Sequence, residues 1–104
     1  MKHMVISVSV GLALASGAAL AADAEQLLKD KNCLTCHQLQ TKVVGPAYKD
    51  VAAKYKARKD AEAYLVTKIK GGSTGVWGPI PMPPNGTVSD DEAKTLAKFV
   101  LTVK

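Results

Sequence analysis

Apolar residues recur at intervals of three and four positions in four short segments of the chain, and no segment shows the apolar-polar alternation of a strand. This spacing places the apolar side chains of each segment on one face of a helix. We therefore predict an all-α fold of about four short helices. The four segments are residues 24–32, 48–55, 60–71 and 89–104.

Turn and capping residues separate these segments. Pro46 disfavours helical backbone at the residue before it, so the second helix begins after this proline. Asp60 is the predicted N-cap of the third helix, which ends at Gly71-Gly72. Ser89 and Glu92 have the spacing of a capping box, and we expect the helix that they open to be the longest.

Residues 71–88 have the composition of a loop. The segment reads GGSTGVWGPIPMPPNGTV, with five glycines, four prolines and almost no charge. A helix or strand interior does not accommodate four prolines in six positions. We predict a stiff loop between the third and fourth helices.

Residues 1–22 have the layout of a secretory signal peptide. Lys2 precedes an apolar run over residues 4–14, and small residues follow as far as Ala22. An uncleaved membrane anchor is the alternative, but this apolar core is interrupted by Ser and Gly and is short for a membrane span. We expect cleavage to release one exported domain, residues 23–104, that does not span a membrane.

The small size of this domain indicates that something besides its core stabilises it. A domain of about 82 residues gains only a few kcal/mol from its polypeptide core. Its two cysteines are three positions apart, and a disulfide across so short a loop would constrain little of the unfolded chain. A metal or cofactor is the expected additional source of stability.

The charge of the predicted domain is moderately basic. Without Lys2 it has 13 Lys and Arg against 9 Asp and Glu, a formal charge of +4. The basic residues are interspersed with acidic ones and form no concentrated stripe, which argues against nucleic-acid binding. Docking to an acidic protein surface is compatible with this charge.

The segment Cys33-Leu34-Thr35-Cys36-His37 is a C-x-x-C-H pattern, which is typical of c-type haem attachment. Two thiols one helical turn apart can add to the two vinyl groups of a porphyrin, and the next residue brings an imidazole to the iron. A thioredoxin-like dithiol is one alternative, but it requires a βαβ context that this sequence does not predict. A zinc site is another, but the motif supplies only three ligands.

Residues 23–104 contain one histidine, His37, and one methionine, Met82. If the iron is six-coordinate, Met82 is the leading candidate for its second axial ligand. A methionine is usually a core residue, but this one lies in the segment Pro79-Ile80-Pro81-Met82-Pro83-Pro84. Because prolines restrict the unbound loop, less entropy is lost when its thioether binds.

Three other residues are candidates for supporting a haem. The indole N–H of Trp77 needs an acceptor if it is buried, and a haem propionate is available, although core packing is the simpler role. Lys68 could bind the same propionate or remain solvated. The Pro46 carbonyl can accept a hydrogen bond from His37 Nδ1 and fix its tautomer. Both tyrosines of the second helix are expected to pack in the core.

Together with C-x-x-C-H, the segments VGPAYKDVAAKY, IKGGSTGVWGPIPMPPN and VSDDEAKTLAKFVL resemble the small bacterial class I c-type cytochromes of the c-551/c-552 type. The resemblance covers all of residues 23–104. It implies that the N- and C-terminal helices cross and that one haem c is attached through Cys33 and Cys36. It also implies that His37 and Met82 are the axial ligands and that Asn85 steadies the methionine sulfur.

The chain departs from the pattern of this family at four places. Asn32 stands where a glycine often precedes the first cysteine, Leu28 where an aromatic residue is common, and Lys68 where an arginine often meets a propionate. Residues 85–88 are one residue longer than in some members. These departures concern the redox potential and the orientation of the methionine.

The resemblance implies a periplasmic one-electron carrier that shuttles electrons between respiratory complexes and a terminal oxidase or reductase. Since His37 and Met82 would leave no open position on the iron, we do not expect an enzyme, and we expect a monomer. Redox proteins would dock transiently at the haem edge near Cys33 and Cys36. Two rival functions remain. One is a five-coordinate, gas-binding haem protein in which Met82 is not a ligand, and the other is a dithiol oxidoreductase.

Overall fold

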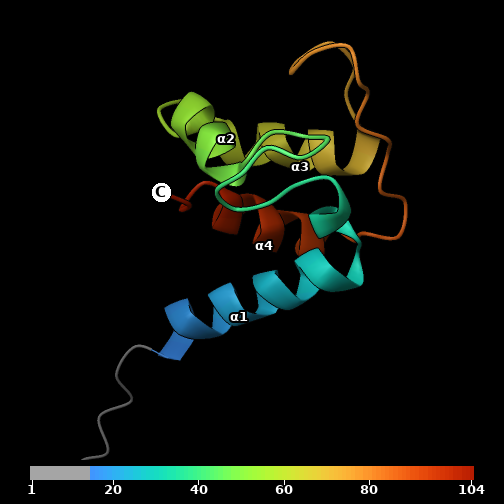
Figure 1. The fold of residues 1–104 in the computed structure, drawn as a ribbon. Coiled ribbons are helices and arrows are strands. Elements are labelled where there is room, and N and C mark those ends of the chain that lie inside the picture. The colour runs from blue at the N-terminus through green and yellow to red at the C-terminus, as the bar shows by residue number, and fades with distance from the viewer. Residues whose placement is uncertain (1–14) are drawn as a thin grey trace, which may run out of the picture.

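The computed structural model describes residues 15–104 and contains no strand within this range. The prediction of an all-α fold with four helices is confirmed (Figure 1). Three helices match the predicted segments to within a few residues. The elements are α1 (Ala15–Asp30), the 3-10 turn η1 (Cys33–Thr35), α2 (Tyr48–Tyr55), α3 (Ala61–Gly71) and α4 (Asp90–Val100).

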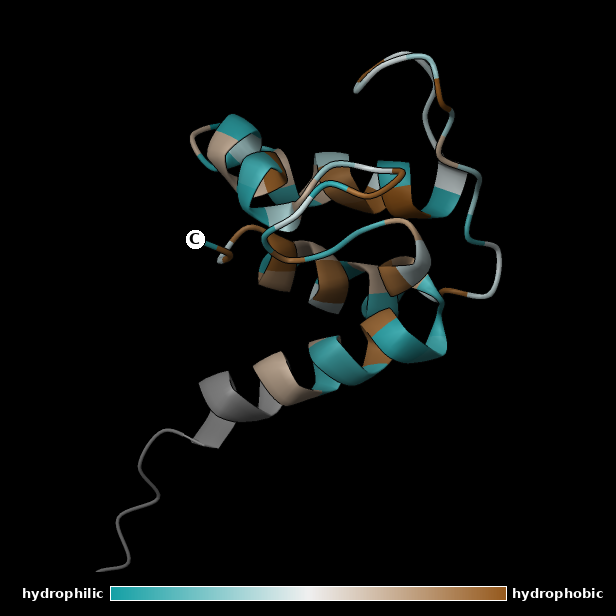
Figure 2. Ribbon diagram, in the orientation of Figure 1, coloured by the Kyte–Doolittle hydropathy of each residue, from teal (hydrophilic) through white to brown (hydrophobic). Residues whose placement is uncertain are grey.

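The core forms around α4, which contacts α1, α2 and α3. The residues that α4 buries are those at helical spacing: Ala93, Leu96, Ala97 and Val100. Hydrophobic segments of α3 and α4 lie where these helices approach each other (Figure 2). Leu28 of α1 and Leu65 of α3 join the same cluster. The terminal helices α1 and α4 therefore pack against each other and hold the two ends of the domain together.

The predicted limits of the first helix are wrong. It begins at Ala15 instead of Ala24, and with 16 residues it is longer than α4, which has 11. The extension is rich in alanine, the residue with the highest helix propensity. The helix ends at Asp30, and Asn32 has a φ of 60°, which a continuing right-handed helix excludes.

The predicted signal-peptide boundary at Ala22 falls inside α1. Residues 1–14 of the predicted signal segment lie outside the described residues, and cleavage stays a prediction. Within residues 15–104, no helix is both long enough and apolar enough to cross a membrane.

The two predicted helix caps have different outcomes. The capping box of α4 is confirmed, because Ser89 Oγ accepts from the Glu92 N–H at 3.1 Å and the Ser89 N–H donates to Glu92 Oε1 at 2.9 Å. Asp60 stands at the N-cap of α3 as predicted, but its side chain makes no capping hydrogen bond. Its carboxylate pairs with Arg58 instead, with Nη2 3.2 Å from Oδ2. Asp60 also lacks the extended backbone of a capping residue, with φ −101° and ψ 23°.

Residues 72–88 form a long loop that leaves the end of α3 and returns to the start of α4 (Figure 1, orange). As predicted, the loop contains no helix or strand. An isolated antiparallel bridge between Ser73 and Met82 joins two parts of the loop. This loop carries Met82, and the segment around η1 carries Cys33, Cys36 and His37.

Candidate functional site

A single tight turn presents the side chains of Cys33, Cys36 and His37. The Cys33 carbonyl accepts hydrogen bonds from the Cys36 N–H at 3.2 Å and from the His37 N–H at 2.9 Å. Asn32 opens the turn in the left-handed region, where asparagine is tolerated better than most residues with a side chain. Both thiols are half-buried and neither is in a disulfide.

The environment of Cys33 does not favour a redox dithiol. Burial raises the pKa of the Cys33 thiol above its usual value. Reactive dithiols need a lowered thiol pKa, because the thiolate is the nucleophile. No strand precedes the turn within the described residues, so the βαβ context of that alternative is also missing. The turn is suited to carry thioethers, which have no acidic proton.

A backbone carbonyl orients the imidazole of His37. His37 Nδ1 lies 2.8 Å from the Pro46 carbonyl oxygen, which is the hydrogen bond that the sequence predicted. A carbonyl oxygen can only accept, so Nδ1 must carry the proton and donate it. In this tautomer the lone pair is on Nε2, the atom available to bind a metal.

The imidazole is also held on its sides. The His37 ring stacks on the ring of Tyr48, with centroids 4.9 Å apart and planes 17° apart. A Cβ atom built on Gly45 would lie 2.5 Å from His37 Cε1, so only a glycine lets the backbone approach this closely. The Gly45 N–H donates to the Cys36 carbonyl at 2.7 Å and ties the two segments together. The sequence did not predict that Tyr48 stacks on the imidazole or that Gly45 lies against it. The only signal for a close approach was the Gly45-Pro46 dipeptide.

Met82 is half-buried and lies in the loop after α3. Its backbone exchanges two hydrogen bonds with Ser73, at 3.0 Å and 2.9 Å. Asn85 is joined to the end of α3, because its Nδ2 donates to the Ile69 carbonyl at 2.8 Å. That bond uses one of the two amide hydrogens, and the contact of Asn85 with the methionine sulfur stays a prediction.

Trp77 is not a core residue in this structure, because 39% of its surface is exposed. Its ring meets Tyr55 edge-on at a centroid distance of 6.2 Å, and Lys54 Nζ lies 4.6 Å from its centroid. Lys68 Nζ lies 5.2 Å from the centroid of the Tyr64 ring. The roles of Trp77 and Lys68 toward a propionate stay predictions.

Tyr64 contacts both Tyr55 and Lys68, and the sequence did not predict these contacts. Its ring packs against Tyr55 with centroids 5.0 Å apart, and the Arg58 guanidinium lies 4.0 Å from its centroid. Tyr55 is buried, and burial raises the pKa of its phenol. Both tyrosines of α2 are buried, so their predicted packing role is confirmed.

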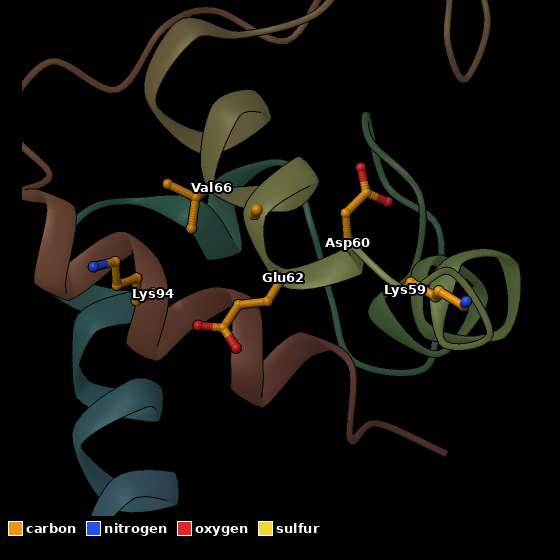
Figure 3. Close-up of a pocket in the computed structure, with 6 residues that line it drawn as sticks. Lys59, Asp60, Glu62, Val66 and Lys94 are labelled. Atoms are coloured by element: carbon orange, nitrogen blue, oxygen red, sulfur yellow. The ribbon is translucent and has the colours of Figure 1, made fainter.

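Two hollows on the surface of the described residues lie elsewhere. One is open to solvent beside α3 and α4 (Figure 3), and it is lined by Lys59, Asp60, Glu62, Ala63, Val66 and Lys94. Another lies between α1 and α4 and is lined by Asp23, Gln26, Leu27, Asp91, Glu92 and Thr95. None of the candidate haem-binding residues lines either hollow, and the candidate site remains the Cys33–His37 turn with the loop of Met82.

Comparison with known proteins identifies the family of this chain. The family model described as Cytochrome c matches residues 21–104. Cytochrome c-551 of Pseudomonas aeruginosa is 62% identical over 96 residues, which are 92% of this chain and 90% of the relative. Cytochrome c-552 of Nitrosomonas europaea is 64% identical over 83 residues, which are 80% of each chain.

Comparison of the fold with solved structures agrees with the comparison of sequences. The crystal structure of wild-type Nitrosomonas europaea cytochrome c552 superposes with a TM-score of 0.75 at 62% identity, and the match covers 77% of this chain and 99% of that one. The donors found here also fit a haem, since two thiols and an imidazole whose lone pair is on Nε2 arise from one turn. The turn of Cys33 and Cys36 therefore carries one covalently bound haem c, and the chain belongs to the cytochrome c family.

Proposed function

We propose that the chain is a one-electron carrier whose haem iron is bound by His37 and Met82. The bound haem supplies an iron that alternates between two oxidation states. The observation that supports the proposal most strongly is the hydrogen bond of His37 Nδ1 to the Pro46 carbonyl at 2.8 Å. It fixes the tautomer that a permanent axial ligand needs, in a turn that also presents both thiols.

The two proposed ligands leave no position for a substrate, which is why we propose a carrier and not an enzyme. Both ligands are neutral, and a thioether favours the reduced iron. His37 is held by Pro46, Tyr48 and Gly45, so little has to move when the charge of the iron changes. A rigid pair of ligands of this kind supports fast electron transfer and a comparatively high potential.

Docking of redox partners is proposed at the haem edge near Cys33 and Cys36. Exposed apolar residues lie on the two loops that carry the proposed ligands: Val43 and Val44 on one, and Ile80, 62% exposed, on the other. Exposed basic residues lie at the end of α2 and in the following turn: Lys54, Lys56, Arg58 and Lys59. Apolar contact with peripheral positive charge suits brief, salt-sensitive association with an acidic partner.

The proposed location is the periplasm, where the carrier would shuttle electrons between respiratory complexes and a terminal oxidase or reductase. The signal-peptide layout of residues 1–22 supports export. The matches to cytochromes c-551 and c-552 support a bacterial electron carrier. We propose that the exported chain acts as a monomer.

Substitution of the proposed methionine ligand tests the function. Met82→Ala is expected to lower the midpoint potential by at least about 59 mV, the shift for a tenfold loss of preference for the reduced state in a one-electron couple. It should also open the iron to added imidazole. The measurement is a redox titration followed by an imidazole titration of the oxidised protein.

Ile80→Ala is the matched control, because Ile80 lies in the same proline-rich segment and is exposed. It should leave both quantities unchanged. If Met82→Ala has the potential and imidazole affinity of the unsubstituted protein, Met82 is not the ligand. The five-coordinate, gas-binding alternative would then be favoured.

A further inference from the structure

Four hydrogen bonds join residues 82–85 to residues 69–73, the segment in which α3 ends, and we call them the α3 clasp. Two are the backbone bonds between Ser73 and Met82, at 3.0 Å and 2.9 Å. The other two come from Asn85, whose backbone N–H and Nδ2 both donate to the Ile69 carbonyl, at 3.2 Å and 2.8 Å. The loop is therefore tied at two points, at Met82 itself and at Asn85, to the segment in which α3 ends.

Gly72 is the point of closest approach in this clasp. A Cβ atom built on Gly72 would lie 2.4 Å from the Met82 carbonyl oxygen and 2.9 Å from the Pro84 nitrogen. Both are backbone atoms, so neither can swing aside as the end of a flexible side chain could. Gly72 also has a φ of 75° and a ψ of −175°, a conformation that residues with a side chain avoid.

We propose that Gly72 is a positioning residue for Met82. Because Gly72 has no side chain, the backbone of the proline-rich loop lies directly against the end of α3. This contact determines the position of the Met82 backbone. The inference rests on the proposed function, because it takes Met82 to be the axial ligand. The inference attributes the position of Met82 to a backbone contact at the C-cap of α3. This contact is separate from any contact with the methionine sulfur.

Two other glycines provide matched controls. Gly75 has the same φ of 75°, but a Cβ atom there would meet nothing within 4 Å. Gly71 has no positive φ and no neighbour within 4 Å of such an atom. Alanine at Gly71 thus tests the loss of a glycine alone, at Gly75 a positive φ without a steric contact, and at Gly72 a positive φ together with the steric contact.

The test is an imidazole titration of the oxidised haem-loaded protein, with the weak red absorption band of methionine-ligated iron as the second readout. Gly72→Ala should bind imidazole roughly tenfold more tightly and lose part of the band, since the backbone cost weakens binding of Met82 by about that factor. Gly71→Ala and Gly75→Ala should keep the affinity and the band of the unsubstituted protein. A Gly72→Ala protein that behaves like Gly75→Ala overturns the proposal.

Met82→Ala separates failure of this inference from failure of the proposed function. If Met82→Ala changes neither readout, the proposed ligation is wrong. If it changes both and Gly72→Ala changes neither, only the positioning role is wrong.

A second measurement covers the case in which Gly72→Ala does not fold. In the unsubstituted haem-loaded protein, the amide hydrogens of Ser73 and Met82 should exchange at least about tenfold more slowly than those of residues 75–78, because the clasp must open first. Equal exchange rates would contradict the clasp.

Discussion

At the scale of single residues, the site depends on how closely the backbone approaches the imidazole of His37. Tyr48 covers one face of the ring, the Pro46 carbonyl holds Nδ1, and Gly45 contributes no side chain. Gly45 has no positive φ, so its backbone conformation would accept alanine. Steric contact with the imidazole is the reason for a glycine at this position.

Gly45→Ala is therefore expected to displace the His37 ring without straining the backbone. Overpacking at such a contact costs about 1–3 kcal/mol, and the free energy of unfolding of the haem-loaded protein should fall by this amount. The midpoint potential should shift as well, because the imidazole changes its orientation. Denaturant unfolding and redox titration measure the two effects.

Gly86→Ala is the control for this substitution, since a Cβ atom on Gly86 would meet nothing within 4 Å. It should change neither the stability nor the potential. If Gly45→Ala is equally silent, the close approach of Gly45 does not hold the imidazole.

Residue type and spacing were sufficient to single out the candidate ligands, because His37 and Met82 have no competitors in residues 23–104. The glycine contacts could not be predicted in the same way. Gly45 and Gly72 meet atoms of segments several residues away, and only the folded backbone brings these atoms together. Asn32 is an intermediate case, because asparagine can adopt the left-handed conformation that a glycine often supplies there.

At the scale of helices, Lys31 links the end of α1 to the start of α4. Its Nζ donates to the Thr87 carbonyl at 2.9 Å and lies 3.7 Å from Glu92 Oε1. The same carboxylate accepts from the Ser89 N–H in the capping box. Glu92 therefore stabilises α4 in two ways, by capping its first turn and by attracting Lys31.

These contacts give Glu92 a predictable pH dependence. The hydrogen bond from the Ser89 N–H, assisted by Lys31, lowers the pKa of Glu92 below its ordinary value of 4.5. A lowered pKa in the folded state stabilises the protein above pH 4.5, and this contribution is lost as the pH falls through the lowered value. Glu92→Gln should therefore melt below the unsubstituted protein at pH 7, and the difference should disappear in acid.

Glu92→Ala separates the charge from the cap, because glutamine keeps an oxygen that can accept from the Ser89 N–H and alanine does not. Its melting temperature should stay below that of the unsubstituted protein even in acid. Melting curves of the three proteins from pH 7 to about pH 3 provide the comparison. A difference between the unsubstituted protein and Glu92→Gln that stays constant over this range would contradict the role of the charge.

Helix limits could be predicted where a local signal marked them. Pro46 and the capping box define the starts of α2 and α4, and Gly71-Gly72 marks the end of α3. The start of α1 could not be predicted in this way, because its alanine-rich extension continues the helix without an apolar stripe. Asp60 shows the limit of a residue-type rule, since its carboxylate pairs with Arg58 and its backbone is not extended as in a capping residue.

At the scale of the whole molecule, the polypeptide core is small. Leu96 is the only large side chain in the described residues that is completely buried, and most of its buried neighbours are alanine, valine and tyrosine. Leu28 fills a core position where the family often has an aromatic residue, and it is almost completely buried. A covalent haem adds the apolar volume that these side chains do not supply.

The fold class could be predicted from helical spacing and from the absence of strand alternation. The path of residues 72–88 could not, because a proline-rich loop has no periodicity to indicate which surface it covers. The bridge of Ser73 to Met82 and the bond of Asn85 to Ile69 determine that path, and both join residues at least nine positions apart.

The central claim is that one covalent haem is bound by His37 and Met82 and carries a single electron. The most direct test is the absorption spectrum of the purified protein at a series of fixed potentials. We predict a single one-electron transition, with the weak red band of methionine-ligated iron in the oxidised spectrum only. A high-spin oxidised spectrum without that band, or a protein without haem absorption, would contradict the claim.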